Sequence, residues 1–331
     1  GELAVDLSLQ EPADGVVANL LDIPERPPVA LTIAGSGPLS GFNADIAFDA
    51  AGERIADGDF TVTQADTGDR RIGFDLAGPI ARILPVEHRA FFGNRTAVTA
   101  DLLLREAGGI DIRRVRLDSG ALDLDASGST LADGFLSDLT VDATLRSEDG
   151  GAVRLPLGGE AVTVEDGTLS LRYGVNAADS WALTGAVNGV ALPDARIGTV
   201  RLDGGGAISG LNDPGDRRVT FAVDSDVAGI EATDPGVANA IGDAITLSAS
   251  GDWSSGDPVR LESATVSGDT FRVDARGRLD GLTFTGSTRV EAADLQAFSL
   301  LADRDLAGSA SLAVDGDIGL VGGRFDVDLD G

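Results

Sequence analysis

Few residues of this chain could take part in catalysis. His88 is the single histidine, and the chain has no cysteine. A Ser-His-Asp triad would have to use His88, but nothing that resembles a nucleophile elbow occurs in the sequence. One histidine without cysteine also argues against a zinc site. We therefore expect His88 to lie on the surface of a short helix, and we expect no enzymatic activity.

Aspartate and glycine are abundant, so calcium binding and phosphate binding by a glycine-rich loop have to be considered. The aspartates could suit calcium, but neither the EF-hand spacing nor the Gly-Gly-x-Gly-x-Asp repeat is present. The clusters Gly35-Ser36-Gly37-Pro38 and Gly204-Gly205-Gly206-Ala207 lack the Gly-x-Gly-x-x-Gly spacing, and the chain has no lysine to serve a phosphate loop. Tight turns explain both clusters. Asn94-Arg95-Thr96 is a glycosylation sequon to which we assign no role, and we expect no metal and no cofactor.

The composition limits the partners and the core. The chain has 331 residues and a formal net charge of -29. Such an excess of negative charge repels phosphates, so we expect no nucleic-acid partner. Hydrophobic residues make up 43% of the chain and aromatic residues only 5%. This predicts a buried surface that consists mostly of Val, Leu, Ile and Ala.

Apolar and polar residues alternate along most of the sequence. Val98, Ala100 and Leu102, for example, alternate with Thr99 and Asp101. Because successive side chains of a strand point to opposite faces, each such run presents one apolar and one polar face. A parallel sheet covered on both sides would need continuous apolar runs instead. We therefore predict an all-β protein of antiparallel meanders.

Helical patterns are short and few. Asp14 and Asp234 are expected N-caps, and Pro235 would occupy the first helical position of its segment. These segments are too short to stand alone, so we expect them to cover an edge or an end of the sheet. The expected helical stretches are 14–21, 79–85, 86–92, 234–241 and 293–301.

The chain contains an internal repeat. Residues 93–128 align without a gap with residues 242–277, at an offset of 149 positions. A further copy is expected from Gly308. Repeated strand units favour an elongated array with a continuous core over a duplicated compact sandwich. We therefore predict one continuous β-repeat array over residues 1–331, and because both ends fall within alternating patterns, we expect it to be a fragment of a larger protein.

Several segments together resemble a known family. They are Pro27 to Leu39, Asp75 to Pro79, Leu84-Pro85 with Phe91-Phe92-Gly93, and Asp234 to Gly277. These stretches resemble the periplasmic β-repeat region of the TamB family, the translocation and assembly module subunits of Gram-negative bacteria, which belong with the AsmA-like, repeating β-groove proteins. The resemblance covers most of the chain, and its motifs are largely structural.

The resemblance implies a fold and a role. Members of this family are similar in having a long sheet curled into an apolar groove, a β-taco. It implies a periplasmic location in a protein anchored in the inner membrane, with a TamA-like outer-membrane barrel as a partner through regions outside this fragment. It also implies a role in outer-membrane biogenesis and in lipid transport between the membranes.

The alternating pattern agrees with such a role, because aliphatic side chains on one face could hold the acyl chains of phospholipids. The alternative is that these side chains pack against one another in a closed core. The residues that we expect to line the groove are Val98, Ala100, Leu102, Leu122, Leu124, Leu139, Val141, Ile245, Leu247, Phe271 and Val273.

Two other functions remain open from the sequence. The chain could be an assembly scaffold that binds β-strands of outer-membrane proteins along a sheet edge, as in autotransporter secretion or barrel assembly. It could also be a surface adhesin built as a β-solenoid. An outer-membrane barrel is disfavoured, because two Trp and one Tyr cannot supply two aromatic girdles.

Overall fold

The computed structural model describes residues 2–38, 40–147, 150–157, 159–177, 179–319 and 322–330, with side chains described up to residue 317 apart from that of Ala177. The fold is all-β and antiparallel, the sheet is not closed, and the helices are few and short. The expected fold class is confirmed at this level. The contacts divide the chain into two compact units, Gly1–Leu169 and Ser170–Gly331. Because the boundary falls within one strand, β12 (Asp166–Gly174), we describe each unit by itself.

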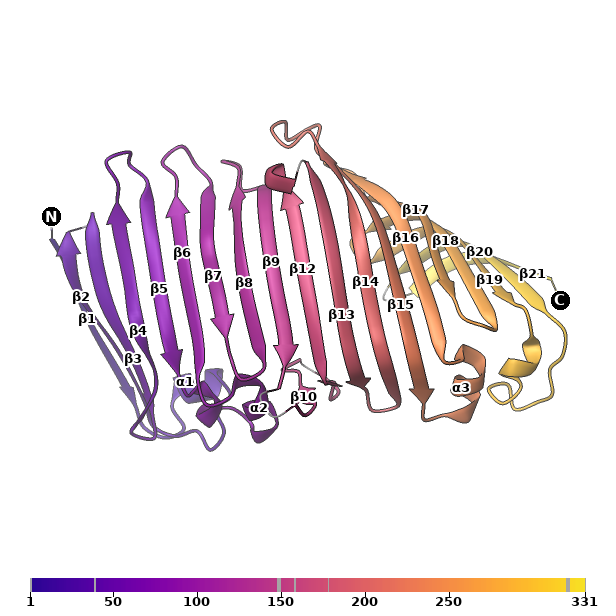
Figure 1. Cartoon of the computed structure of the whole chain (residues 1–331), viewed down its shortest axis with the longest axis horizontal. Helices are drawn as coiled ribbons and strands as arrows, with labels where there is room; N and C mark the ends of the chain where they lie inside the picture. The colour runs from indigo at the N-terminus through magenta and orange to yellow at the C-terminus, as the bar shows by residue number, and fades with distance from the viewer. Residues whose placement is uncertain are drawn as a thin grey trace. The chain divides into compact units, whose positions relative to one another are not determined.

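Unit 1 is a meander in which each strand from β1 to β9 pairs antiparallel with the next (Figure 1). Its strands are β1 (Glu2–Glu11), β2 (Val29–Pro38), β3 (Gly41–Ala50), β4 (Glu53–Gln64), β5 (Arg70–Gly78), β6 (Thr96–Leu104), β7 (Ile110–Asp118), β8 (Leu122–Thr130), β9 (Leu136–Arg146), β10 (Val153–Arg154) and β11 (Thr163–Val164). Its helices are α1 (Val16–Leu20), η1 (Ile80–Ile83), η2 (Val86–His88) and α2 (Arg89–Phe92).

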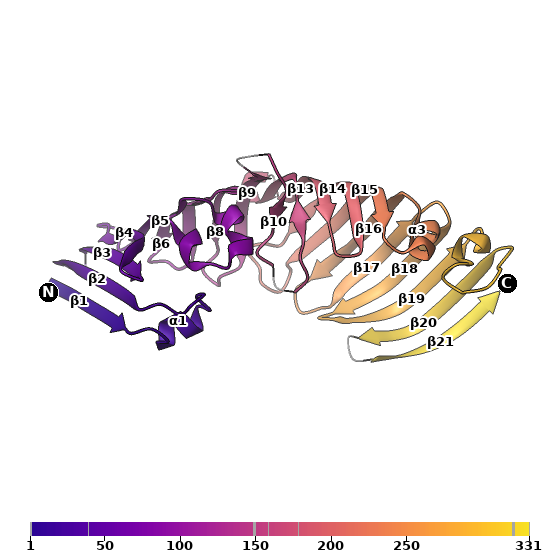
Figure 2. The ribbon, with the colours of Figure 1, turned by 90° about the horizontal axis from the view of Figure 1, so that it is seen from below.

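Unit 2 continues the same pattern, with antiparallel pairing from β13 to β21. Figure 2 shows that these strands follow a curved surface. Its remaining strands are β13 (Ser180–Ala191), β14 (Ala195–Ser209), β15 (Arg218–Ala232), β16 (Ala244–Ser254), β17 (Val259–Ser267), β18 (Phe271–Asp280), β19 (Thr283–Ala292), β20 (Ala310–Gly319) and β21 (Gly322–Asp330). Its helices are η3 (Val175–Ala177), α3 (Pro235–Ile241) and η4 (Leu295–Phe298).

The short helices lie where the sequence places them, and one of the two expected N-caps is correct. The Asp234 carboxylate accepts hydrogen bonds from the backbone N–H groups of Gly236 and Val237, at 2.7 and 3.0 Å, so its role as an N-cap is confirmed. The N-cap assigned to Asp14 is wrong. Asp14 has a φ of 64° and precedes the capping position. A carboxylate from the end of β1 takes its place, because Glu11 accepts from the N–H of Val17 at 2.7 Å.

Of the remaining helical predictions, 86–92 matches η2 and α2 together, whereas 79–85 and 293–301 are correct in place and too long. Pro85 separates η1 from η2, as its lack of an N–H and its fixed φ require. The stretch 293–301 forms only the 3₁₀ turn η4, with the Asp294 carboxylate accepting from the N–H of Gln296. His88 lies on η2 as expected, but it is half-buried, and its Nδ1 is buried without a hydrogen-bond partner among the described residues.

The two repeat copies have the same three-strand layout. Strands β6 to β8 correspond to β16 to β18 at the offset of 149. Each copy has an irregularity at the equivalent place, between Asp101 and Leu102 in one and between Ser250 and Gly251 in the other. A second irregularity separates Ile112 from Val115, and Leu261 from Ala264.

A helix ends at a glycine before each copy. Gly93 follows α2 with φ and ψ of 67° and −165°, and Gly242 follows α3 with 77° and −165°. This backbone region is open almost only to glycine. Since the caps and the bulges recur at the same offset, the copies share backbone geometry as well as residue pattern. Gly308 precedes β20 with a φ of 88°, but a third copy from this position stays a prediction.

Candidate functional site: the apolar faces of the two units

Strand pairing in unit 1 places most of the apolar residues of the nine meander strands on one face. Directly opposed residues on paired strands point to the same side of a sheet, so the pairing can be followed from strand to strand. We call this side the apolar face of unit 1. One row across it, from β1 to β9, is Leu7, Ile33, Ile46, Gly58, Leu76, Val98, Leu117, Leu124 and Ala143. The next row is Val5, Gly35, Ala44, Phe60, Phe74, Ala100, Val115, Ala126 and Val141.

Unit 2 has an equivalent surface, the apolar face of unit 2. Its rows contain small or polar residues at a few positions, such as Ser225 and Thr288, but are otherwise aliphatic. One row, from β13 to β20, is Gly185, Leu202, Ser225, Leu247, Val266, Val273, Val290 and Leu312. The next is Leu183, Gly204, Val223, Ala249, Ala264, Ala275, Thr288 and Val314.

All eleven residues expected to line a groove fall on these two faces. Seven lie on the apolar face of unit 1, on strands β6, β8 and β9, and four lie on that of unit 2, on β16 and β18. None is fully buried. Ten are half-buried, and Leu247 is 39% exposed. Their side chains therefore reach solvent in part, as on a sheet face that no second layer covers. Whether they contact lipid stays a prediction.

Fully buried clusters form where helices cover the apolar face of unit 1. Around α1, Ala18 packs with Ile23, Val29, Ala50 and Ile55, and all five are at most 4% exposed. These helices lie at one end of the strands (Figure 1). The sealed core of unit 1 is thus at this end, whereas the middle of the strands keeps its half-exposed aliphatic surface.

A second buried cluster in unit 1 surrounds α2. Phe91 packs with Ala121 and Val153, and the half-buried Leu122 and Leu145 lie against them. Leu122 therefore belongs to the apolar face and also packs against this buried cluster. Of the expected lining residues, it is the one whose environment is closest to an ordinary core.

The opposite face of each unit is charged. In unit 1 the row that contains Asp45, Asp59 and Asp75 places three carboxylates side by side on β3, β4 and β5. Elsewhere arginines pair with the aspartates. Arg71 donates to both carboxylate oxygens of Asp101 at 2.7 and 2.6 Å, and this hydrogen bonding holds the pKa of Asp101 below its ordinary value. Such exposed pairs contribute little to stability but keep this face hydrated.

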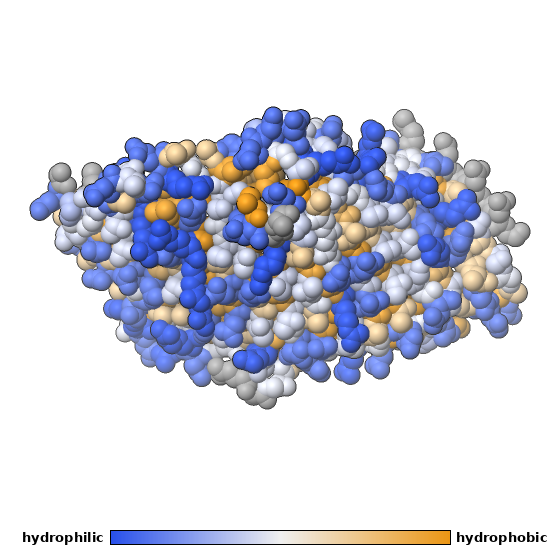
Figure 3. All heavy atoms as spheres, turned by 45° about the horizontal axis from the view of Figure 1, so that its top comes forward, coloured by the Kyte–Doolittle hydropathy of each residue, from blue (hydrophilic) through white to orange (hydrophobic). Residues whose placement is uncertain are grey.

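Unit 2 has the same arrangement. Arg272 donates to both oxygens of Asp274 at 2.7 and 2.8 Å, and with a hydrogen bond from Thr265 it lowers the pKa of Asp274. Figure 3 shows hydrophobic side chains in patches among hydrophilic ones on the side that it displays.

Sequence reasoning missed part of the apolar faces. The list of expected lining residues contains no aromatic residue of β4 or β5, although Phe60 and Phe74 are directly opposed on the apolar face of unit 1. It also left out Trp181, whose Nε1–H donates to the carbonyl of Thr220 at 2.9 Å. The same alternation that placed the other residues could have found all three.

The described residues offer no candidate metal centre. No group of three or more His, Cys, Asp or Glu among them is placed to hold a metal ion. No helix in the described part of the chain is long and apolar enough to span a bilayer. Comparisons with protein-family models, with curated proteins and with solved structures found no match.

Proposed function

We propose that the chain binds hydrocarbon, namely the acyl chains of phospholipids, on its two apolar faces. The observation that carries this proposal is the set of mostly apolar rows that cross each unit, in which most side chains are only half-buried. A closed core would instead bury these side chains almost completely, as the cluster around α1 does. Single exposed aliphatic residues are ordinary, but contiguous rows of them indicate a binding surface.

The chemistry of the faces suits an acyl chain. Each methylene buried on such a surface contributes about 0.8 kcal/mol. The rows carry few polar groups that could fix one position, so a chain held there would bind with little specificity and could move along the rows. The charged opposite faces favour solubility of the protein while the apolar faces are occupied.

The wider role rests on the resemblance to the TamB family. On that ground we propose that the chain is a periplasmic segment of a TamB-like protein, which takes part in lipid transport from the inner to the outer membrane and in outer-membrane biogenesis. The anchor in the inner membrane and the TamA-like barrel partner belong to the same proposal. Copurification of phospholipid with the chain expressed in the periplasm tests its first step.

Photocrosslinking tests the assigned faces. A photoreactive residue at Leu124 or Val273, on the apolar faces, is expected to crosslink to phospholipid. The same residue at Asp123 or Asp125, on the opposite face of β8, is expected to crosslink far less. Equal yields from both faces would contradict the proposal.

A second candidate function follows from the edge of unit 1. The sheet is not closed, and β1 pairs with β2 on one side, which leaves its other edge free of described partners. Leu3, Leu7 and Leu9 on this strand are 39%, 48% and 36% exposed. Such an edge could receive a β-strand of an outer-membrane protein, as an assembly scaffold would. This function predicts crosslinks to protein from Ala4 and Asp6, with no bound lipid.

A further inference from the structure

A pocket with a volume of about 680 Å³ lies at the helical end of unit 1. Four segments form it. Arg82 comes from η1, Arg89 from α2, Gly120 from the turn before β8, and Ser147 from the position after β9. Asn94, which follows α2, completes its polar lining. The pocket is thus assembled by tertiary packing from segments that are far apart in the sequence.

The pocket is unusual in its charge. The chain carries a net charge of -29, yet the described lining contains two arginines and no acidic residue. Arg89 donates through Nε to the carbonyl of Leu84 at 3.0 Å and forms no ion pair with a described carboxylate. Arg82 contacts Glu53 at 2.5 Å, but both side chains are more than half exposed, so this pair is weak.

Two guanidinium groups with an amide form a donor set for a phosphate group. The planar fork of arginine matches two oxygens of a phosphate and forms charge-assisted hydrogen bonds with them. The side-chain amide of Asn94 can donate a further hydrogen bond. A carboxylate of this acidic chain would be a poorer occupant, because it offers fewer acceptor oxygens in the same space.

The pocket adjoins the apolar face of unit 1. Strand β5 ends at Gly78, one residue before the lining residue Pro79, and β8 begins at Leu122, two residues after Gly120. The helical segments that supply the arginines bury apolar neighbours in two different clusters. Ile80 and Ile83 of η1 pack on the cluster around α1, and Phe91 belongs to the cluster around α2.

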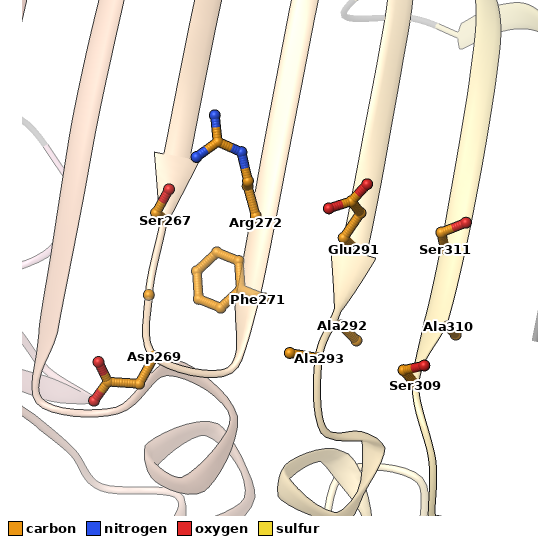
Figure 4. Close-up of a pocket in the computed structure, with 11 residues that line it drawn as sticks. Ser267, Asp269, Phe271, Arg272, Glu291, Ala292, Ala293, Ser309, Ala310 and Ser311 are labelled. Carbon is orange, nitrogen blue, oxygen red and sulfur yellow. The ribbon is translucent and has the colours of Figure 1, made fainter.

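The repeat copy in unit 2 provides a natural comparison. At the offset of 149, Arg89 corresponds to Ala238, Asn94 to Asp243 and Gly120 to Asp269. A pocket of about 670 Å³ in unit 2 shares only Asp269 with these equivalent positions; it lies between β17, β18, β19 and β20, and its lining also includes Glu291 and Arg272 (Figure 4). Arg272 is already engaged by Asp274 on its own strand. The equivalent positions of unit 2 therefore have no arginine in place of Arg89 and a carboxylate in place of Asn94.

We infer that the pocket of unit 1 binds a phosphate group and, resting on the proposed function, that this is the headgroup phosphate of a phospholipid whose acyl chains lie on the adjoining apolar face. The pocket would set where along the face a lipid stops, whereas the aliphatic rows alone would let it slide. Inorganic phosphate carries the same group as a phospholipid headgroup. The experiment below therefore distinguishes binding of inorganic phosphate from binding of phospholipid.

The test exchanges the unit 1 site for the residues of unit 2. The double variant Arg89→Ala/Asn94→Asp removes one cation and adds one carboxylate. A control, Arg116→Ala/Ser8→Asp, makes the same change in charge on the polar face of unit 1. Calorimetric titration of the full chain uses three probes: inorganic phosphate, monomeric short-chain phosphatidylglycerol, and an alkyl glucoside without phosphate. Urea unfolding checks that each variant is folded.

We expect the double variant to bind the short-chain phospholipid about tenfold or more weakly than the parent and control, with binding of the alkyl glucoside unchanged. Equal phospholipid affinity in all three proteins overturns the phosphate site. Binding of inorganic phosphate as tight as that of phospholipid, and lost in the double variant, supports the pocket but assigns it to free phosphate. Absence of alkyl glucoside binding in the parent contradicts the proposed function instead, and leaves the phosphate result to be judged by the inorganic probe.

Discussion

The two repeat copies share a backbone and differ in what closes their strand ends. Strands β6 to β8 and β16 to β18 have the same bulges and the same glycine after the preceding helix. In unit 1, however, Phe91 fills the space between α2 and the sheet, and its equivalent in unit 2 is Ala240. Geometry is therefore retained where strands pair, whereas the chemistry of the helical end is free to diverge.

The difference at the helical end follows from the neighbours of each helix. In unit 1, α2 contacts the short strand β10, and Val153 of that strand is buried against Phe91. The ring of Phe91 fills the space between α2 and β10. In unit 2, α3 contacts η4 instead, and the small Ala240 occupies the equivalent position.

Phe91→Ala tests this difference with the largest expected effect. The substitution copies the unit 2 residue into unit 1, where no neighbour fills the vacated space, so we expect a loss of about 3 to 5 kcal/mol in the free energy of unfolding. Urea unfolding followed by circular dichroism measures it. Val86→Ala, at a side chain that is 74% exposed, serves as the control and should change the free energy of unfolding by less than about 0.5 kcal/mol. A loss of under about 1 kcal/mol for Phe91→Ala would contradict the claim that the ring fills the space between α2 and the sheet.

Gly93→Ala and Gly242→Ala test the shared caps. Both glycines have a backbone conformation that costs a residue with a Cβ about 1 to 3 kcal/mol. At Gly93 an added Cβ would also meet the Cα of Gly120 at 2.6 Å, whereas at Gly242 the nearest atom is the Oδ2 of Asp269 at 3.5 Å. We expect Gly93→Ala to be the more destabilising of the two in urea unfolding. Equal losses in the free energy of unfolding would mean that the backbone around Gly120 can shift to accommodate the added Cβ at little cost.

Much of this comparison could be predicted from the sequence. Alternation is a local property of each strand, and because β-strands have a period of two, it placed Val98 and Leu124 correctly on one face before any pairing was known. The cap by Asp234 could also be predicted, because it depends on residues close together in the chain, and the offset of 149 could be predicted because the residue pattern of 93–128 recurs in 242–277.

Other features depend on tertiary contacts and could not be predicted. The cap of α1 comes from Glu11 rather than Asp14, because the path of the chain after β1 brings that carboxylate to the helix. The pocket of Arg82 and Arg89 needs two helical segments and a distant turn to meet at Gly120. The division into two units within β12 has no linker to mark it in the sequence.

Leu124→Ala and Val273→Ala sharpen the comparison of the two apolar faces, because these residues are equivalent in the repeat. Both are half-buried, so we expect each substitution to lower the free energy of unfolding by only about 1 kcal/mol. A sealed core would give losses of about 2 to 5 kcal/mol for Leu124→Ala. Urea unfolding of the lipid-free chain decides between these outcomes. Large losses at both positions would end the acyl-chain proposal.

The smallest expected effect lies on the polar faces, where the copies differ in charge pairing. Strand β18 carries Arg272 beside Asp274, and the equivalent positions of β8 are Asp123 and Asp125. Arg272 and Thr265 lower the pKa of Asp274 from its ordinary value of 3.8. We expect Arg272→Ala to raise that pKa, and carboxyl NMR titration measures the change, with Arg289→Ala on the neighbouring strand as the control.

The sign of the effect on stability follows from the direction of this shift. A carboxyl group with a lowered pKa in the folded protein stabilises the fold above pH 3.8, and this contribution is lost as the pH falls through the lowered pKa. Arg272→Ala should therefore reduce the stability of unit 2 slightly at neutral pH and leave it unchanged once Asp274 is protonated in both proteins. A reduction that persists in strong acid would mean that the alkyl part of Arg272, rather than its charge, stabilises this face.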